Sequence, residues 1–258
     1  MEYVNSKLSE ISENLPEYTA NFMETAKKHG DHLQKTLKDY ANEVQNNYEV
    51  SILQDFVENL PEHTANFMLT KAITGATVGA CHNAANYIIK DGERWSNILN
   101  IFYKKVVNSY GYPRWYARID RPHTNFDSYH INVNPKVTGV PDPHIRIFGI
   151  TAHGAGWMGR GLNLINKVAP VAMAASVAYD AKDVWDDYSD GKREEAMRKG
   201  VSKVSTYVVA SFGANIGAAI GSWIFPGVGT LLGGLLGGVV GGIGGGVGGE
   251  VLAVVFNL

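Results

Sequence analysis

The residues with the clearest chemical potential lie within positions 122–150, a stretch rich in histidine, asparagine and proline. His130 and Asn132 alternate with apolar residues, so an extended strand would place both side chains on one face. Asp142 and His144 have the same spacing. Imidazole and carboxylate groups serve as acids, bases and metal ligands near neutral pH. This set predicts a catalytic or divalent-metal site.

Neighbouring residues extend the set. Four of the eight histidines fall within 31 residues, namely His123, His130, His144 and His153. With Asp120 and Asp142 they could hold a metal ion, and Arg146 could contact a phosphate in a nuclease-type site. No known ligand spacing such as His-Glu-x-x-His occurs. The metal is therefore unknown, no cofactor is predicted, and enzymatic activity stays open. The competing interpretation is a proline-rich loop held by Asn and Asp hydrogen bonds to its own backbone.

The elements that must position this module are mainly helical. A length of 258 residues fits one large or two smaller domains. We predict a mainly α fold with a helical arm, a C-terminal glycine-rich helical hairpin and a small β or irregular module between them. The predicted segments are the arm, the basic and His-rich module, a helical connector and the hairpin, at residues 1–90, 91–153, 154–203 and 204–258.

The C-terminal segment is dominated by 46 consecutive residues without a charged side chain, from Val204 to Gly249. Glycines recur there at every fourth position, which places them on one face of a helix and lets another helix backbone approach closely. These glycines are Gly213, Gly217, Gly221, Gly229, Gly233, Gly237, Gly241, Gly245 and Gly249. The breaker pair Pro226-Gly227 leaves 22 residues on each side, and about 20 residues span a bilayer.

This pattern predicts a helical hairpin with its tip at Pro226 and Gly227. In water, each interior glycine costs a helix about 1 kcal/mol relative to alanine. In hydrocarbon, unpaired backbone groups cost more than this, and the helix is favoured. We therefore predict contact with a lipid bilayer and a homo-oligomer associated through the glycine rows. The alternative is a glycine-rich hairpin buried in a soluble core.

The N-terminal part has a different character. Residues 1–62 carry 12 acidic and 5 basic side chains and show helical spacing of apolar residues, which predicts an amphipathic arm. The unit Glu13–Met23 returns at Glu58–Met68 with 10 of 11 positions identical, which indicates a local duplication. The acidic N-terminus is unlike a signal peptide. We expect synthesis as a soluble protein followed by membrane association, with non-classical secretion left open.

Two stretches link the arm to the His-rich module. Residues 71–89 are rich in small side chains and predict a helix that could dock on the hairpin. Residues 90–121 carry 7 basic and 3 acidic side chains among aromatic residues. Such a mixture can be a partly buried surface, a headgroup contact or a base-stacking surface. We do not favour nucleic acid as a partner. Residues 122–150 are the only region with a convincing non-helical pattern, and we expect the β or irregular module at about residues 110–150.

The connector after this module is predicted to be helical. The glycines of residues 154–161 indicate a flexible lead-in, followed by a helix over residues 162–188 that Pro170 kinks. An aspartate cluster at residues 180–190 lacks the calcium-loop pattern and indicates a solvated helix end. Residues 191–203 predict a short charged helix just before the hairpin.

Residues 122–257 together resemble a segment of polymorphic-toxin-like and effector-like proteins. The residues that carry the resemblance are Tyr129–Pro135, Asp142–His144, Gly159–Ala178 and Gly213–Gly249. The resemblance implies a membrane-inserting hairpin beside a small His-Asn-Asp module, and it transfers no functional residue.

Three hypotheses follow. The first is a membrane-active, toxin-like protein whose hairpin inserts, oligomerises and permeabilises a bilayer. The second is a toxin-type metal-dependent nuclease or hydrolase that uses the residues around His130 and His144. The third is a membrane-associated scaffold without toxic action. We favour the first, because the uncharged stretch is the most unusual feature of the chain.

Overall fold

The computed structural model describes residues 64–256. The predicted amphipathic arm lies outside them. The chain divides into two compact units, and the unit from Lys71 to Ala253 contains the sheet and most of the described helices. The other unit is described at the first turns of α3 (Thr64–Asn86) and at the end of α7 (Val228–Val255). The predicted mainly α fold, with a C-terminal hairpin and a small antiparallel sheet in the middle, is confirmed.

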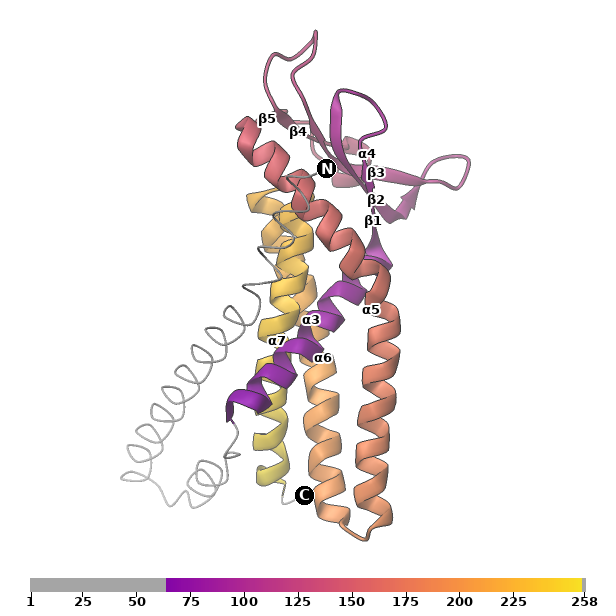
Figure 1. Cartoon of the computed structure of the whole chain (residues 1–258), viewed down its shortest axis with the longest axis vertical. Coiled ribbons are helices and arrows are strands. Elements are labelled where there is room, and N and C mark those ends of the chain that lie inside the picture. Colours follow the sequence, from indigo (N-terminus) through magenta and orange to yellow (C-terminus); the bar gives the residue numbers. More distant parts are fainter. Residues whose placement is uncertain (1–63, 257–258) are drawn as a thin grey trace, which may run out of the picture. The chain divides into compact units, whose positions relative to one another are not determined.

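The sheet is an antiparallel meander in the order β1-β2-β3-β4-β5 (Figure 1). Its strands are β1 (Tyr87–Asp91), β2 (Asn97–Val107), β3 (Pro113–Asp120), β4 (His130–Val133) and β5 (Ile145–Arg146). Ile101 of β2 pairs with Ile89 on one side and Ala117 on the other, and Ile119 of β3 pairs with Ile131 of β4. These apolar side chains are buried.

The expectation that the non-helical module begins at about residue 110 was wrong, because the sheet already begins at Tyr87. The first five residues of β2 are all buried, so this strand lacks the alternation of apolar and polar residues that marks a half-exposed strand. A short helix, α4 (Pro135–Thr138), follows β4. Asn134 caps it, since its side chain accepts a hydrogen bond from the Lys136 amide.

Helix α5 (Gly149–Ser189) covers the sheet with its first turns. The predicted flexible lead-in over residues 154–161 was wrong, since these residues are helical. A Cβ at Gly156 would lie 2.7 Å from Ile98, and a Cβ at Gly159 would lie 2.5 Å from Leu99. The glycines therefore allow close packing on the sheet. Pro170 lies inside α5, which changes direction along its length (Figure 1).

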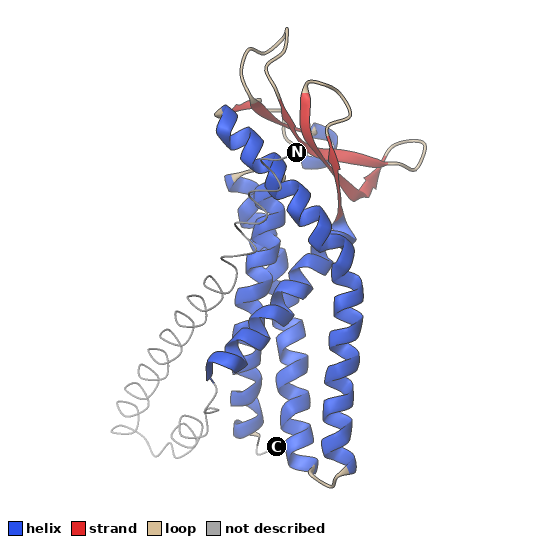
Figure 2. Cartoon of the chain, in the orientation of Figure 1, coloured by secondary structure: helices blue, strands red, loops and turns tan. Residues whose placement is uncertain are grey.

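The hairpin consists of α6 (Arg193–Ile224) and α7 (Val228–Val255). The charged stretch before Val204 is the start of α6 and not a separate helix, because no breaker follows Arg193 before the tip. In Figure 2 the strands gather at one end of α5, α6 and α7. The core at this end joins Leu99 and Ile119 of the sheet to Leu162 of α5 and to Val228 and Leu231 of α7.

Candidate functional site

The first glycine row of the hairpin forms the contact between α6 and α7. A Cβ at Gly213 would lie under 3.0 Å from the backbone of Gly237, a separation that real Cβ atoms essentially never show. The same relation joins Gly217 to Gly233 and Gly221 to Gly229. The remaining glycines of this row, Gly241, Gly245 and Gly249, lie against Val209, Ser205 and Ser202 of α6. Both helix backbones thus touch along the length of the hairpin.

A second row of glycines on α7 packs on α3, namely Gly234, Gly238, Gly242 and Gly246. Gly75 lies against Gly238, and Gly79 lies against Gly234, again too closely for any side chain. Nearby, Asn83 is fully buried and donates a hydrogen bond of 2.8 Å from Nδ2 to the carbonyl oxygen of Leu231. The predicted docking of the small-residue helix on the hairpin is confirmed. Within the Lys71–Ala253 unit, α7 is therefore packed between α6 and α3 through glycine faces.

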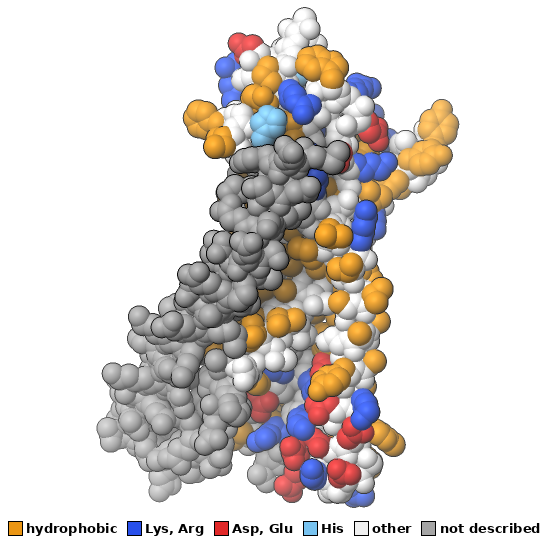
Figure 3. Space-filling model, in the orientation of Figure 1, with side chains coloured by type: hydrophobic (Ala, Val, Ile, Leu, Met, Phe, Trp, Pro, Cys, Tyr) orange, Lys and Arg blue, Asp and Glu red, His pale blue; other side chains and the backbone are white. Residues whose placement is uncertain are grey.

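The faces of α5 and α6 that point away from these contacts are exposed and mainly apolar, with Lys167 as the charged residue of α5 between Arg160 and Asp180. On α6 they carry Val204, Val208, Phe212, Ile216, Ile220, Trp223 and Ile224, and on α5 they carry Val168, Val171, Val177, Tyr179 and Trp185. Figure 3 shows hydrophobic side chains along the middle of these helices. Among the described residues, α5, α6 and α7 are each long and apolar enough to cross a membrane. These helices are compatible with membrane association.

A group of ion pairs joins α5 and α6 at the end away from the sheet, where Figure 3 shows charged side chains gathered. Lys203 lies 2.9 Å from Asp183 and also pairs with Asp180, while Lys199 pairs with Asp183 and Asp187. We call these five residues the charged collar. The aspartate cluster is thus partly paired, whereas the sequence indicated a solvated helix end.

The predicted tip residues, Pro226 and Gly227, do separate the two helices of the hairpin, and the tip rests on the sheet. Gly227 has a φ of +93°, and a Cβ there would lie 2.9 Å from the Ala117 side chain. Thr230 receives a hydrogen bond of 3.3 Å from the Gly227 amide and lies 3.1 Å from the hydroxyl of Tyr116. The sheet therefore holds the tip by packing and by the hydrogen bond between Tyr116 and Thr230.

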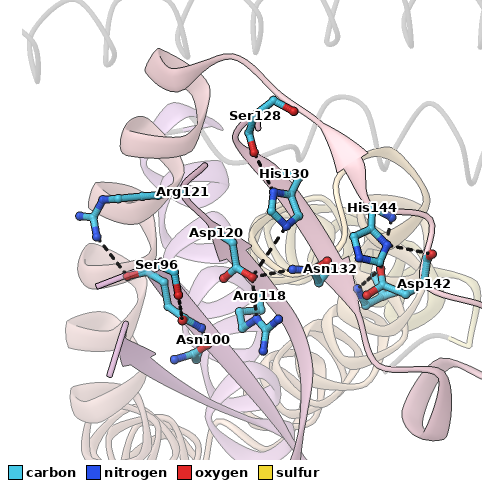
Figure 4. A network of polar contacts seen from close by, with 12 residues as sticks. Ser96, Asn100, Arg118, Asp120, Arg121, Ser128, His130, Asn132, Asp142 and His144 are labelled. Atoms are coloured by element: carbon cyan, nitrogen blue, oxygen red, sulfur yellow. Dashed lines mark hydrogen bonds and ion pairs between the residues drawn. The ribbon is translucent and has the colours of Figure 1, made fainter. Parts of the chain in front are cut away.

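The polar residues of the His-rich module form a second cluster, on β3 and β4 (Figure 4). The register places Asp120 opposite His130 and Arg118 opposite Asn132. Asp120 Oδ2 accepts hydrogen bonds from Arg118 Nε at 2.9 Å and from Asn132 Nδ2 at 2.6 Å. His130, Asn132 and Asp120 are each at most 2% exposed. The cluster is therefore a buried network centred on Asp120.

The other two predicted catalytic residues lie at the edge of this network. Asp142 Oδ1 accepts hydrogen bonds from the amides of Val133 and His144, as the loop interpretation expected. His144 has a φ of 45°, which is unusual for a residue with a side chain. Its ring stacks on that of His130 at a centroid distance of 5.8 Å. A catalytic role for His130, Asn132, Asp142 and His144 stays a prediction.

The structure adds Arg118, which the sequence reasoning missed, to the polar network. It places His153 and Arg146 outside that network. Arg118 contacts the network directly, and its two-residue spacing from Asp120 on a strand was the available signal. His123 lies against His130, with ring centroids 5.2 Å apart. His153 instead contacts Tyr129, and Arg146 lies 3.5 Å from Asp127 on the exposed side of β5.

Comparisons with known proteins match two separate parts of the chain, one containing the sheet and one containing most of the hairpin. A family model described as the C13G5.2-like N-terminal domain matches residues 70–165, and one described as the C13G5.2-like glycine zipper domain matches residues 189–248. The first range contains the whole sheet and its polar network, and the second contains most of the hairpin.

A Caenorhabditis elegans protein named uncharacterized protein C13G5.2 is 39% identical over 144 residues, which are 54% of this chain and 41% of that protein. The chain thus matches less than half of that relative's length. No solved structure matches the chain. The glycine rows that pack in α7 and the matching family model agree that the C-terminal region of this protein is a glycine-zipper region.

Proposed function

We propose that this protein inserts the α6–α7 hairpin, together with α5, into a lipid bilayer. The observation that carries the proposal is the exposed apolar surface of α5 and α6 between the charged collar and the sheet. Soluble monomers rarely expose contiguous apolar patches of such extent. In a bilayer the same side chains contact lipid, and their exposure carries no penalty.

The dimensions of the uncharged part support this proposal. Val204 to Ile224 is 21 residues of continuous helix after the last collar residue, Lys203. At about 1.5 Å per residue this part is about 30 Å long, close to the hydrocarbon thickness of a bilayer. Trp223 is 89% exposed near the sheet end, and Trp185 is 66% exposed near the collar. Tryptophan is enriched at both membrane interfaces.

The glycine contacts indicate which helix faces remain available for contact between copies of the protein in the bilayer. In the Lys71–Ala253 unit, both glycine rows of α7 face partners of the same chain. We therefore propose that α6 and α7 enter the bilayer as a packed pair and that association between copies uses the apolar outer faces of α5 and α6. This differs from association through the glycine rows, which the sequence favoured.

A test of insertion places a charge on the outer face of α6. Ile216→Lys changes a residue that is 61% exposed, so the packing of the protein itself is preserved. A lysine near the middle of a bilayer costs about 3 kcal/mol. We expect the variant to float with liposomes much less than the unchanged protein in a density gradient. Tyr110→Lys, at an 84% exposed residue of the turn between β2 and β3, is the matched control and should float normally. Equal flotation of both variants would contradict insertion.

A second proposed function is permeabilisation of the bilayer after insertion. It is tested because the sequence resembles toxin-like proteins. Dye release from liposomes is measured with the full chain and with a chain that ends at residue 203, at neutral and acidic pH. Release by the full chain alone supports a permeabilising hairpin. Stable insertion without release identifies a membrane-anchored scaffold instead.

A further inference from the structure

We propose that Asp120, His123 and His130 bind a transition-metal dication, with Zn²⁺ as the best-fitting class. Each of these residues offers a ligand atom, and the three atoms lie within 4.8 Å of one another. The site lies in the polar network of β3 and β4, apart from the helices proposed to enter the membrane. It therefore does not depend on membrane insertion.

A hydrogen bond fixes the orientation of the His130 ring. His130 Nδ1 lies 2.8 Å from the carbonyl oxygen of Ser128. A carbonyl oxygen only accepts hydrogen bonds, so Nδ1 carries the hydrogen and donates it. A hydrogen bond from one ring nitrogen to a backbone carbonyl is the usual way in which a protein orients a metal-binding histidine. Nε2 is thus the nitrogen available to a metal.

This nitrogen has no hydrogen-bond partner among the described residues. His130 Nε2 is buried and makes no hydrogen bond within the described part of the chain. Its nearest charged neighbour, Asp120 Oδ2, lies 3.9 Å away, beyond hydrogen-bonding distance. Leaving a buried polar atom without a partner costs about 1–3 kcal/mol. A metal ion bound at Nε2 would remove this cost.

The two oxygens of the Asp120 carboxylate differ in their hydrogen bonding. Oδ2 accepts hydrogen bonds from Arg118 and Asn132, whereas Oδ1 is buried and has no partner among the described residues. A carboxylate that binds a metal through one oxygen is typically hydrogen-bonded by outer residues in this way. Arg118 and Asn132 therefore act as positioning residues for Asp120.

His123 completes the set from the segment between β3 and β4. It forms an isolated β-bridge with Phe126 and is half-buried, while Asp120 and His130 are fully buried. Neighbouring ligand atoms of a tetrahedral zinc ion lie about 3.3 Å apart, from bonds of about 2.0–2.1 Å. The ligand atoms, which lie within 4.8 Å of one another, must therefore close by up to about 1.5 Å, and His123 is the least buried of the three.

Two imidazoles and one carboxylate are a ligand set that zinc accepts, and magnesium and calcium prefer oxygen ligands. Three protein ligands leave a fourth position for water or a substrate atom. His123, the half-buried ligand, is the part of the site most accessible to solvent. The site is therefore of the open kind and not the closed kind of structural zinc sites.

The test uses the full chain in detergent micelles, first treated with a chelator and then titrated with Zn²⁺ and, separately, Co²⁺. We expect one ion per chain by calorimetry, together with the visible absorbance of tetrahedral Co²⁺. His123→Ala removes a half-buried ligand, so the fold is preserved, and it should weaken binding about 100-fold or more. His153→Ala, at a histidine outside the cluster, is the matched control and should bind as tightly as the unchanged protein.

Circular dichroism before titration shows that each variant is folded. Absence of binding to the folded, unchanged protein at micromolar Zn²⁺ would overturn the proposal. Equal binding by His123→Ala and His153→Ala would also overturn it, since the ion would then be held elsewhere. Neither result bears on flotation with liposomes, so failure of the metal site and failure of membrane insertion are distinguishable.

Discussion

Gly237 of α7 lies so close to Gly213 of α6 that a side chain on either residue would collide with the backbone of the other. Such contacts recur along the hairpin and again between α7 and α3. Direct backbone contact is how helices associate in a membrane, where apolar side chains gain little by leaving lipid. The glycine rows therefore act as a packing surface inside one chain.

A leucine at Gly237 should separate α6 from α7. Gly237→Leu places a side chain where the Gly213 carbonyl lies, and overpacking of this kind costs about 1–3 kcal/mol or more. We expect a clear fall in the thermal midpoint of the protein in detergent, measured by circular dichroism.

Gly244→Leu is the control for this change. Gly244 lies on the same helix, is exposed, and would meet no atom within 4 Å of an added Cβ. It should leave the midpoint nearly unchanged. A similar loss in both variants would show that helix propensity, and not the contact with Gly213, determines the effect.

Removal of a collar lysine should loosen the junction of α5 and α6. Lys203 is 17% exposed and pairs with both Asp180 and Asp183. Lys203→Met leaves Asp180 without its cation and leaves Asp183 with Lys199 alone, which costs about 1–3 kcal/mol. The expected result is a lower denaturation midpoint in detergent. Lys182→Met removes an exposed pair with Asp186 and should have little effect; equal losses would contradict a structural role of the collar.

The contact between hairpin tip and sheet is tested at Gly227. Gly227→Ala introduces strain at a φ of +93° and a clash with the side chains of Ala117 and Ile101. Strain at positive φ costs about 1–2 kcal/mol, and the clash adds to it. Gly111→Ala has similar strain at a φ of +82° but open space. We expect Gly227→Ala to be the more destabilising in chemical denaturation, and equal effects would show that the tip is not held by the sheet.

His82 should make stability depend on pH. Burial, and then the nearby charge of Lys105, lower the pKa of His82 below its ordinary value of 6.5. The unfolded chain therefore binds this proton more tightly than the folded protein. Stability contributed by neutral His82 is complete above pH 6.5 and falls as the pH decreases below it. The thermal midpoint is measured at about pH 7.5 and about pH 5.5. We expect it to fall less between these conditions in His82→Gln than in the unchanged protein. An equal fall in both proteins would show that groups other than His82 cause the pH dependence.

Local patterns in the sequence determined the helical hairpin. Glycine at every fourth position, the absence of charge from Val204 to Gly249, and the breaker pair Pro226-Gly227 are all properties of neighbouring residues. They were sufficient for the two helices and the tip, because helix formation and helix ends depend on residues within a few positions. The alternation from His130 to Asn132 likewise indicated a strand, which is β4.

Tertiary structure decided which surfaces meet. Strands β1 and β2 lie before the predicted module and were missed. The first residues of β2 are buried on both faces, which removes the alternating pattern. The identity of the partner for each glycine row depended on how α3, α6 and α7 pack. The polar network likewise depended on register, because Asp120 and His130 are ten positions apart in the chain and become neighbours only through the pairing of β3 with β4. Spacing alone indicated the chemical groups, and the sheet brought Asp120 and His130 together.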